Sequence, residues 1–228
     1  MITDPQTTPI LFLSGAGLPA WIWDDVRDSL PVESVVATSP RQADATLRDY
    51  VDAALAQAPG PVFTIVAHSI GGVVASEIAA SAPERIDGLL GIAVSVPPAG
   101  TSYLDAMPLP QRLVMGLIMR FAGTKPPEKA IRSGLCSGLG DADTARIVEE
   151  FAPESPRLYR DRVSARTFPA RSGYVVTTSD RVIRAAEQQK HAAELGSNFH
   201  REMLTGHLPM LEDPASLTKI VEEFKSQD

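Results

Sequence analysis

Three side chains in this sequence have the types needed for a nucleophile, a base and an orienting acid. Ser69 stands one residue after 61–67, a run of mostly apolar, β-forming residues, with His68 between them. A serine hydroxyl is a poor nucleophile at neutral pH and needs a neighbouring base that a third group orients. His207 and Asp180 lie in polar loops further along the chain and have the right types for the base and the acid. Together they predict nucleophilic attack on an ester carbonyl.

The residues around Ser69 follow the small-x-Ser-x-Gly pattern of a nucleophile elbow, in which a tight strand-to-helix turn lifts a serine hydroxyl clear of the sheet. Ala67 and Gly71 stand two residues either side of Ser69, where larger side chains would collide with the neighbouring backbone. Gly72 lets the next helix approach the sheet closely. The pattern therefore predicts that Ser69 is the nucleophile.

Asp180 and His207 each follow an expected strand, and loops that follow parallel strands share one edge of the sheet. We therefore expect Ser69, Asp180 and His207 to converge, in the chain order Ser, Asp, His. Structural alternatives stay open for each. Ser69 could cap a helix, Asp180 could cap the helix expected near residue 182, and His207 could bond only to backbone.

The other candidates for base and acid fit less well. His191 lies on an expected helix, His200 lies within an expected strand, and His68 precedes the nucleophile with its side chain pointing away. The loop after the strand expected at 88–96 has no carboxylate before Asp105. Asp180 is therefore favoured as the acid.

Ester hydrolysis also needs donors aimed at the oxyanion that develops. The amide of Ile70, directly after the nucleophile, is one candidate. Residues 14–17 (Ser-Gly-Ala-Gly) form a glycine-rich turn that exposes backbone N–H groups, and Ala16 is the second candidate. A plain glycine turn is the alternative for this segment.

The elements that must position these residues alternate between strand and helix. The patterns predict strands at 9–13, 34–38, 61–67, 88–96, 173–178 and 198–204, and helices at 21–30, 41–58, 73–82, 182–195 and 214–225. Such alternation predicts an α/β fold whose mostly parallel sheet has helices on both faces. Residues 97–167 break the alternation with a helical pattern rich in proline and glycine. We expect a core of residues 1–96 and 168–228 with a small helical cap inserted at 97–167.

The bulk properties suit one soluble domain. The chain has 228 residues, 44% of them hydrophobic, and a net charge of −7 without a basic run, which argues against nucleic acid as a partner. Its single cysteine, Cys136, cannot form an internal disulfide. The polar residues 1–8 do not resemble a signal peptide, and no apolar run approaches the roughly 20 residues that span a bilayer. We expect a cytoplasmic protein that does not bind membranes, and a homodimer stays open.

These residues together resemble α/β-hydrolases of the branch that holds plant methylesterases, hydroxynitrile lyases and related bacterial esterases. The resemblance covers nearly the whole chain, and its best local matches are residues 14–23, 67–72, 174–180 and 206–211. It implies an α/β-hydrolase fold with Ser69 as nucleophile, His207 as base and Asp180 as acid. It also implies Ala16 and Ile70 as oxyanion donors.

Departures from the family pattern separate two activities. The usual His-Gly pair of the oxyanion loop is Ser14-Gly15 here, so a side chain that commonly braces this loop is replaced. Hydroxynitrile lyases that resemble this chain use a threonine in that loop and a lysine beside the catalytic histidine, at the positions of Gly15 and Leu208. Cyanohydrin cleavage is therefore not expected.

The first half of the predicted cap is apolar and rich in methionine, a residue that adapts to irregular partners. The candidate pocket residues are Gly15, His68, Met115, Met119 and Leu208. The alternative is that the apolar side chains of the cap only pack it onto the core.

We thus expect a serine hydrolase that cleaves a small or medium apolar carboxylic ester, such as a methyl ester or a lactone, through an acyl-enzyme. No metal or organic cofactor is expected. Carbon–carbon bond hydrolysis, lyase chemistry or cyclisation of a natural-product intermediate would use the same triad. A binding protein that has lost catalysis is the third hypothesis.

Overall fold

A parallel sheet of six strands runs through the centre of the computed structural model, which describes residues 5–227. Its spatial order is β2-β1-β3-β4-β5-β6. The strands are β1 (Ile10–Leu13), β2 (Ser34–Val36), β3 (Phe63–His68), β4 (Ile86–Ile92), β5 (Ser172–Thr177) and β6 (Phe199–Met203). All the neighbouring strands pair in parallel, so the loops after the strands meet at one edge.

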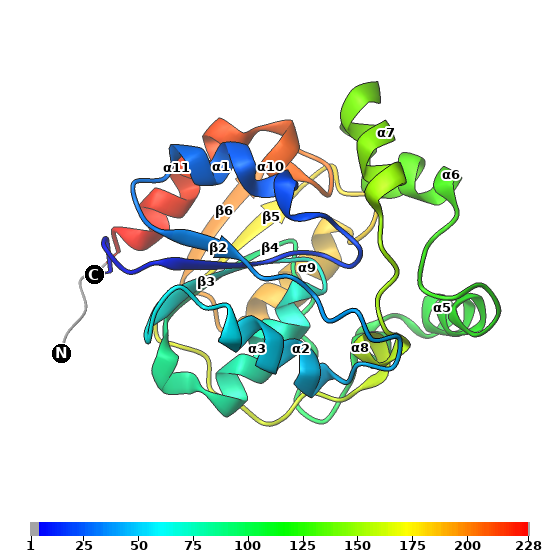
Figure 1. Cartoon of the computed structure of the whole chain (residues 1–228), viewed down its shortest axis with the longest axis horizontal. Coiled ribbons are helices and arrows are strands. Elements are labelled where there is room, and N and C mark those ends of the chain that lie inside the picture. Colours follow the sequence, from blue (N-terminus) through cyan, green and yellow to red (C-terminus); the bar gives the residue numbers. More distant parts are fainter. Residues whose placement is uncertain (1–4, 228) are drawn as a thin grey trace.

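Helices cover both faces of the sheet (Figure 1). The core helices are α1 (Asp24–Ser29), α2 (Leu47–Ala56), α3 (Gly71–Ser81), α9 (Ala185–Leu195), α10 (Pro209–Glu212) and α11 (Pro214–Lys225). Side chains alternate along β1, so that Leu11 and Leu13 pack in a cluster with α2, α3 and α9, while Ile10 and Phe12 pack in a second cluster with α1 and α11. The predicted two-sided α/β core is the fold observed.

Several elements have other bounds than the patterns predict. The helix expected at 41–58 begins only at Leu47, because Thr46 and Asp49 form a capping box at its start. The strand expected at 88–96 ends at Ile92, because Ala93 has a φ of 46° and breaks the extended chain. The expected helix at 21–30 is a 3₁₀ turn, Ala20–Trp23, followed by α1.

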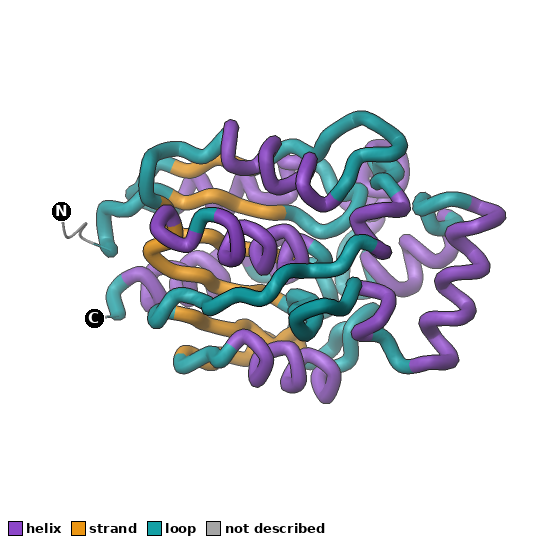
Figure 2. Tube along the Cα trace, turned by 90° about the horizontal axis from the view of Figure 1, so that it is seen from below, coloured by secondary structure: helices purple, strands orange, loops and turns teal. Residues whose placement is uncertain are grey.

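Residues 97–167, here named the cap segment, contain the helices between β4 and β5. These are α4 (Tyr103–Ala106), α5 (Leu109–Ala122), α6 (Glu128–Ala130), α7 (Asp141–Glu150) and α8 (Pro156–Arg160), with a π-helical turn at Ile131–Leu135. Figures 1 and 2 place α5, α6 and α7 beyond the carboxyl ends of the strands. No helix within residues 5–227 is both long and apolar enough to cross a lipid bilayer.

Candidate active site

Ser69 lies at a strained turn between β3 and α3. Its φ is 54°, and Ala93 is the other non-glycine residue of the described chain with a positive φ. Such a backbone costs about 1–3 kcal/mol and persists only where its surroundings hold it. Here the carbonyl of Ser69 accepts hydrogen bonds from the amides of Gly72 (3.2 Å) and Ser95 (2.9 Å). The turn has the geometry of a nucleophile elbow.

The glycines after Ser69 allow this turn because β-carbons would not fit there. A β-carbon on Gly71 would lie 2.5 Å from the carbonyl oxygen of Leu13, and one on Gly72 would lie 2.5 Å from that of Ser95. Both distances are far below a normal contact. The close approach predicted from the small residues around the serine is therefore present.

Asp180 and His207 form a buried pair. Nδ1 of His207 lies 2.7 Å from Oδ2 of Asp180, and the two side chains are 1% and 0% exposed. Because the carboxylate accepts the Nδ1 proton, Nε2 is the nitrogen of His207 left to act as a base. The structure thus brings together two residues that lie 27 positions apart, as their placement after neighbouring strands predicts.

Hydrogen bonds hold the carboxylate of Asp180 in its ionised form. Burial alone would raise the pKa of this group. The hydrogen bond and charge of His207, together with the amides of Ile183 (3.0 Å) and Val182 (2.6 Å) on Oδ1, outweigh burial and lower the pKa. An ionised Asp180 can stabilise the imidazolium that forms when His207 takes a proton.

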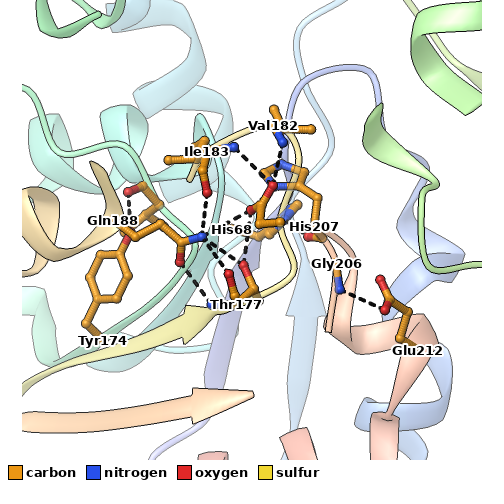
Figure 3. Close-up of polar contacts among 11 residues, drawn as sticks. His68, Tyr174, Thr177, Val182, Ile183, Gln188, Gly206, His207 and Glu212 are labelled. Atoms are coloured by element: carbon orange, nitrogen blue, oxygen red, sulfur yellow. Dashed lines mark hydrogen bonds and ion pairs between the residues drawn. The ribbon is translucent and has the colours of Figure 1, made fainter. Parts of the chain in front are cut away.

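Gln188 on α9, which the sequence analysis does not single out, fixes the loop of the acid. Its side chain is fully buried, and Nε2 donates to Oδ2 of Asp180 (3.2 Å) and to the carbonyl of Ile183 (2.7 Å). Its Oε1 accepts from the amide of Thr177 (3.0 Å), and the Thr177 hydroxyl also donates to Asp180 (3.0 Å). Figure 3 shows the side-chain amide of Gln188 in contact with Thr177 and Ile183. The signal in the sequence is the spacing, because Gln188 shares one face of the helix with the apolar Ala192 and Leu195.

Two further groups hold the loop of His207. The amide of Gly206 donates to Oε2 of Glu212 (2.8 Å), and Nε2 of His68 lies 2.8 Å from the carbonyl oxygen of His207. The imidazole rings of His68 and His207 lie 4.7 Å apart. Since a carbonyl only accepts, His68 carries its proton on Nε2. Burial, followed by the neighbouring His207, lowers the pKa of His68 to about 3, so this ring is neutral.

The simpler structural roles considered for the three residues account for only part of their contacts. α3 has Ile70 as its N-cap and α9 has Arg184, so neither Ser69 nor Asp180 is the N-cap of a helix. Oδ1 of Asp180 does bind the two amides of the turn that follows, as a cap would, but Oδ2 binds His207. The ring of His207 bonds to a carboxylate. Asp105, the other acid considered, accepts from the Ser102 amide and pairs with Arg112 at 2.7 Å.

Ser69 and the free nitrogen of His207 do not yet bond to each other. Within residues 5–227 neither the Ser69 hydroxyl nor Nε2 of His207 makes a hydrogen bond. The ring of His207 nevertheless packs on His68, the residue next to the nucleophile. Hydrogen bonds between nucleophile and base are often long without substrate and tighten when it binds.

Two backbone amides near Ser69 are free to bind an oxyanion. Among the described residues, the N–H groups of Ala16 and Ile70 have no hydrogen-bond partner. Gly15 comes so close to the elbow that a β-carbon on it would lie 3.0 Å from Cβ of Ser69 and from Nδ1 of His68. On its far side this loop is braced by Trp23, whose Nε1 donates to the Ser14 hydroxyl (3.0 Å).

A cavity of about 400 Å³, here named the acid-side cavity, lies next to these loops. Its lining includes Ser95, Tyr103, Met107, Ile183 and His191, but not Ser69 or His207. Its wall contacts the site through two backbone hydrogen bonds, from the amide of Ser95 to the carbonyl of Ser69 and from the amide of Ile183 to Oδ1 of Asp180. Burial and the charge of Asp180 raise the pKa of Tyr103 to about 12, so its hydroxyl stays protonated.

The residues predicted to line a pocket are mostly packed away from this cavity. Gly15, His68, Met119 and Leu208 are buried, Met115 is half-buried, and the lining of the acid-side cavity includes none of the five. Met115 and Met119 pack against the core through one side of α5. The other apolar side chains of that helix are exposed, namely Leu109, Leu113, Val114, Leu117, Ile118 and Phe121.

Metal-ligating side chains do not gather in the part of the chain that the structure describes. No group of three or more His, Cys, Asp or Glu side chains is arranged there to hold an ion. Cys136 is free and buried, and burial raises its pKa to about 11.

Comparison with solved structures gives the same fold for several proteins at low sequence identity. An extracellular alpha/beta-hydrolase from a Paenibacillus species, described as a structural and functional homologue of tobacco Salicylic Acid Binding Protein 2, superposes with a TM-score of 0.85. It is 16% identical, over 96% of this chain and 100% of that one. The Arabidopsis methylesterase MES16 (TM-score 0.74, 16% identity, 95% and 98% covered) and polyneuridine aldehyde esterase (0.74, 15%, 95% and 99%) are also similar.

At such identities the likeness extends to the fold alone, and no curated protein is significantly similar in sequence. The family model described as the alpha/beta hydrolase family, however, matches residues 10–219, which is most of the chain. The chain therefore belongs to the alpha/beta hydrolase family.

Proposed function

We propose that the protein is a serine esterase in which Ser69 is the nucleophile, His207 the general base and Asp180 the orienting acid. The observation that carries the proposal is the buried hydrogen bond of 2.7 Å between His207 and Asp180, next to an elbow that holds Ser69 at positive φ. It leaves one nitrogen of His207 available beside the elbow. Ala16 and Ile70 supply the amides for the oxyanion.

The first half of the reaction forms an acyl-enzyme. Oγ of Ser69 attacks the carbonyl carbon of the ester while Nε2 of His207 takes the hydroxyl proton. The oxyanion of the tetrahedral intermediate accepts hydrogen bonds from Ala16 and Ile70, each worth about 3–4 kcal/mol when well placed. The bond to the alcohol then breaks, and the alcohol leaves with the proton held by His207.

The second half releases the acid. A water molecule gives a proton to Nε2 of His207 and attacks the acyl carbon, and the bond to Oγ of Ser69 breaks as that oxygen regains the proton. Throughout both halves Asp180 keeps the Nδ1 proton of His207 in place and offsets the charge of the imidazolium. Over both halves the reaction consumes one ester and one water molecule and returns every side chain to its starting state.

The acid-side cavity favours a small or medium ester as substrate, because its volume of about 400 Å³ is at the lower end for ligand sites. Val96, Met107 and Ile183 form an apolar part of its lining, which also includes charged side chains such as Glu187 and Lys190. The methylesterase and the polyneuridine aldehyde esterase that share the fold favour an ester, and we propose a methyl ester or a lactone as the natural class.

A panel of p-nitrophenyl and methyl esters of increasing acyl length tests the proposal. The wild type should hydrolyse the short and medium members, and Ser69→Ala and His207→Ala should each lose about 10³-fold or more in kcat. A wild type that turns over no ester in the panel contradicts the proposal. So does a Ser69→Ala variant that keeps wild-type rates.

A further inference from the structure

Two hydrogen bonds join the cap segment to Gly17 in the oxyanion loop, residues 14–17. The amide of Gly17 donates to Oε1 of Glu154 (3.2 Å), and its carbonyl accepts from the amide of Ala152 (3.1 Å). Gly17 has a φ of 71°, and a β-carbon there would lie 2.4 Å from the ring of Phe151. Only glycine fits this position, which directly follows the proposed oxyanion donor, Ala16.

The carboxylate of Glu154 is itself fixed to the core. Its Oε2 accepts from the hydroxyl of Tyr50 on α2 (2.7 Å), and its Oε1 also accepts from the hydroxyl of Ser39 (3.0 Å). The Tyr50 hydroxyl accepts in turn from the amide of Ser155 (3.0 Å). Burial and the bond to Glu154 raise the pKa of Tyr50, so this phenol stays protonated and keeps donating. Glu154 is thus a rigid acceptor for the loop.

Side-chain packing alone does not hold the loop at this place. A cavity of about 620 Å³ lies along it, lined by Ser14, Gly17, Leu18, Gly71 and Glu154 among others. Phe151 packs closely against Gly17 on one side, but the side that faces the cavity lacks such contacts, so hydrogen bonds contribute more to the orientation of the backbone there. It is tied at Ser14 by Trp23 and at Gly17 by Glu154, with Ala16 between the two ties.

We propose that Glu154 is a positioning residue for the oxyanion hole, acting from the cap segment through the amide of Gly17. Fixing the Ala16–Gly17 peptide at one end and Ser14 at the other sets the direction in which the Ala16 N–H points. Glu154 touches neither the substrate nor the reacting atoms. The inference rests on the proposed function, because it assigns a role in stabilising the transition state of that reaction.

The test combines ester kinetics with local hydrogen exchange in Glu154→Ala, Glu154→Gln and Glu154→Asp. Glu150→Ala is the matched control, since Glu150 borders the same cavity and carries the same charge, but its carboxylate bonds to the side chains of Trp21 and Arg146 and not to the oxyanion loop. Glu154→Ala should lower kcat by roughly tenfold to a hundredfold, because a misplaced oxyanion donor costs up to about 10²–10³. KM should change by less than about twofold, because the bond matters only in the transition state.

The conservative variants separate positioning from folding. Glu154→Gln keeps a carbonyl oxygen for the Gly17 amide and should restore kcat to within about threefold of the wild type. Glu154→Asp keeps the charge but falls short of the loop, so its kcat should lie between those of the glutamine and alanine variants. If Glu154→Ala does not fold, this ordering of Gln above Asp carries the test.

Hydrogen exchange in peptides that cover residues 14–19 gives a readout independent of activity. Exchange should be faster in Glu154→Ala than in Glu150→Ala and the wild type. The inference is overturned if Glu154→Ala keeps the kcat and the exchange rates of the wild type. It is also overturned if the variant raises KM and leaves kcat unchanged. A wild type that cleaves no ester, together with faster exchange in Glu154→Ala, overturns the proposed function while the hold of Glu154 on the loop stands.

Discussion

Oδ2 of Asp180 and Nδ1 of His207 lie 2.7 Å apart in a place that solvent does not reach. The pair is satisfied from several sides, since the amides of Val182 and Ile183 bind the other carboxylate oxygen. A buried charge without such partners would be costly, so the pair and its surroundings form one unit.

Replacing Asp180 by asparagine should remove the carboxylate that orients His207 while keeping a side chain of the same size. The amide can no longer fix the proton on Nδ1 or offset the charge of the imidazolium, so kcat should fall by about 10³–10⁴-fold. The fold should persist because the side chain has the same shape. Steady-state kinetics and circular dichroism check both parts, and a kcat within tenfold of the wild type would show that Asp180 is not the acid.

The lowered pKa of Asp180 also predicts how its effect on stability depends on pH. A carboxyl whose pKa is lower in the folded state stabilises the fold above its unfolded value of about 3.9, and this contribution is lost as pH falls through the folded pKa. The difference in free energy of unfolding between the wild type and Asp180→Asn should therefore shrink below about pH 4. Urea unfolding at pH 6 and pH 3 measures it, and a constant difference would contradict the prediction.

His68 should remain neutral throughout the working range of the enzyme. Its folded pKa of about 3 lies below the unfolded value of about 6.5, so the unfolded chain binds the extra proton between these values. Stability linked to His68 is thus complete above about pH 6.5 and falls as pH drops towards 3. NMR titration of the imidazole nitrogens should show a proton on Nε2 and no titration from pH 5 to 8. Protonation of both nitrogens near pH 6 would contradict this.

Replacing the side chain of Gln188 should loosen the loop that carries Asp180. Gln188→Leu leaves several buried donors and acceptors of Thr177, Asp180 and Ile183 without partners, each costing about 1–3 kcal/mol. We expect a lower free energy of unfolding by at least about 2 kcal/mol and a lower kcat. Gln189→Leu, at the exposed next position of α9, is the control and should change stability by less than about 0.5 kcal/mol. Equal effects from the two variants would count against the network.

Two glycines allow a matched test of the elbow. Gly71→Ala places a β-carbon 2.5 Å from the carbonyl oxygen of Leu13 and should cost about 1–3 kcal/mol or more, with most of the activity lost. Gly116→Ala on α5 meets nothing within 4 Å and should stabilise the protein by about 0.5–1 kcal/mol. Thermal unfolding and kinetics compare them, and a neutral Gly71→Ala would contradict the close approach at the turn.

The features that the sequence predicts well depend on local patterns. The tight turn at Ser69 is predicted because a β-forming run precedes it, small residues flank it and a helix-forming segment follows it. The contact between Asp180 and His207 is predicted because each residue follows a strand at the same edge of the sheet. The start of α2 at Leu47 could also have been predicted, because Thr46 and Asp49 have the spacing of a capping box. The apolar spacing that begins near residue 41 favoured an earlier start. These signals are all within a few residues of the feature they predict.

Contacts between segments that do not follow neighbouring strands could not be predicted in this way. Glu154 reaches Gly17 across 137 positions, and no pattern near either residue indicates the other. The strand expected at 88–96 failed for a related reason, because Val94 and Val96 are buried although Ala93 has turned the chain. Burial by tertiary packing made a loop resemble a strand. Met115 and Met119, which the sequence places among the candidate pocket residues, likewise pack against the core, while large apolar side chains on the same helix are exposed.

The central claim is that the hydroxyl of Ser69 is a nucleophile activated by His207. Intact-mass and peptide analysis after treatment with a fluorophosphonate tests it most directly, since the reagent bonds covalently to an activated serine oxygen. The wild type should carry one adduct per chain on the peptide that contains Ser69, Ser69→Ala should carry none, and His207→Ala should be labelled about 10²-fold or more slowly. An unlabelled wild type, or a label on another residue that persists in Ser69→Ala, would contradict it.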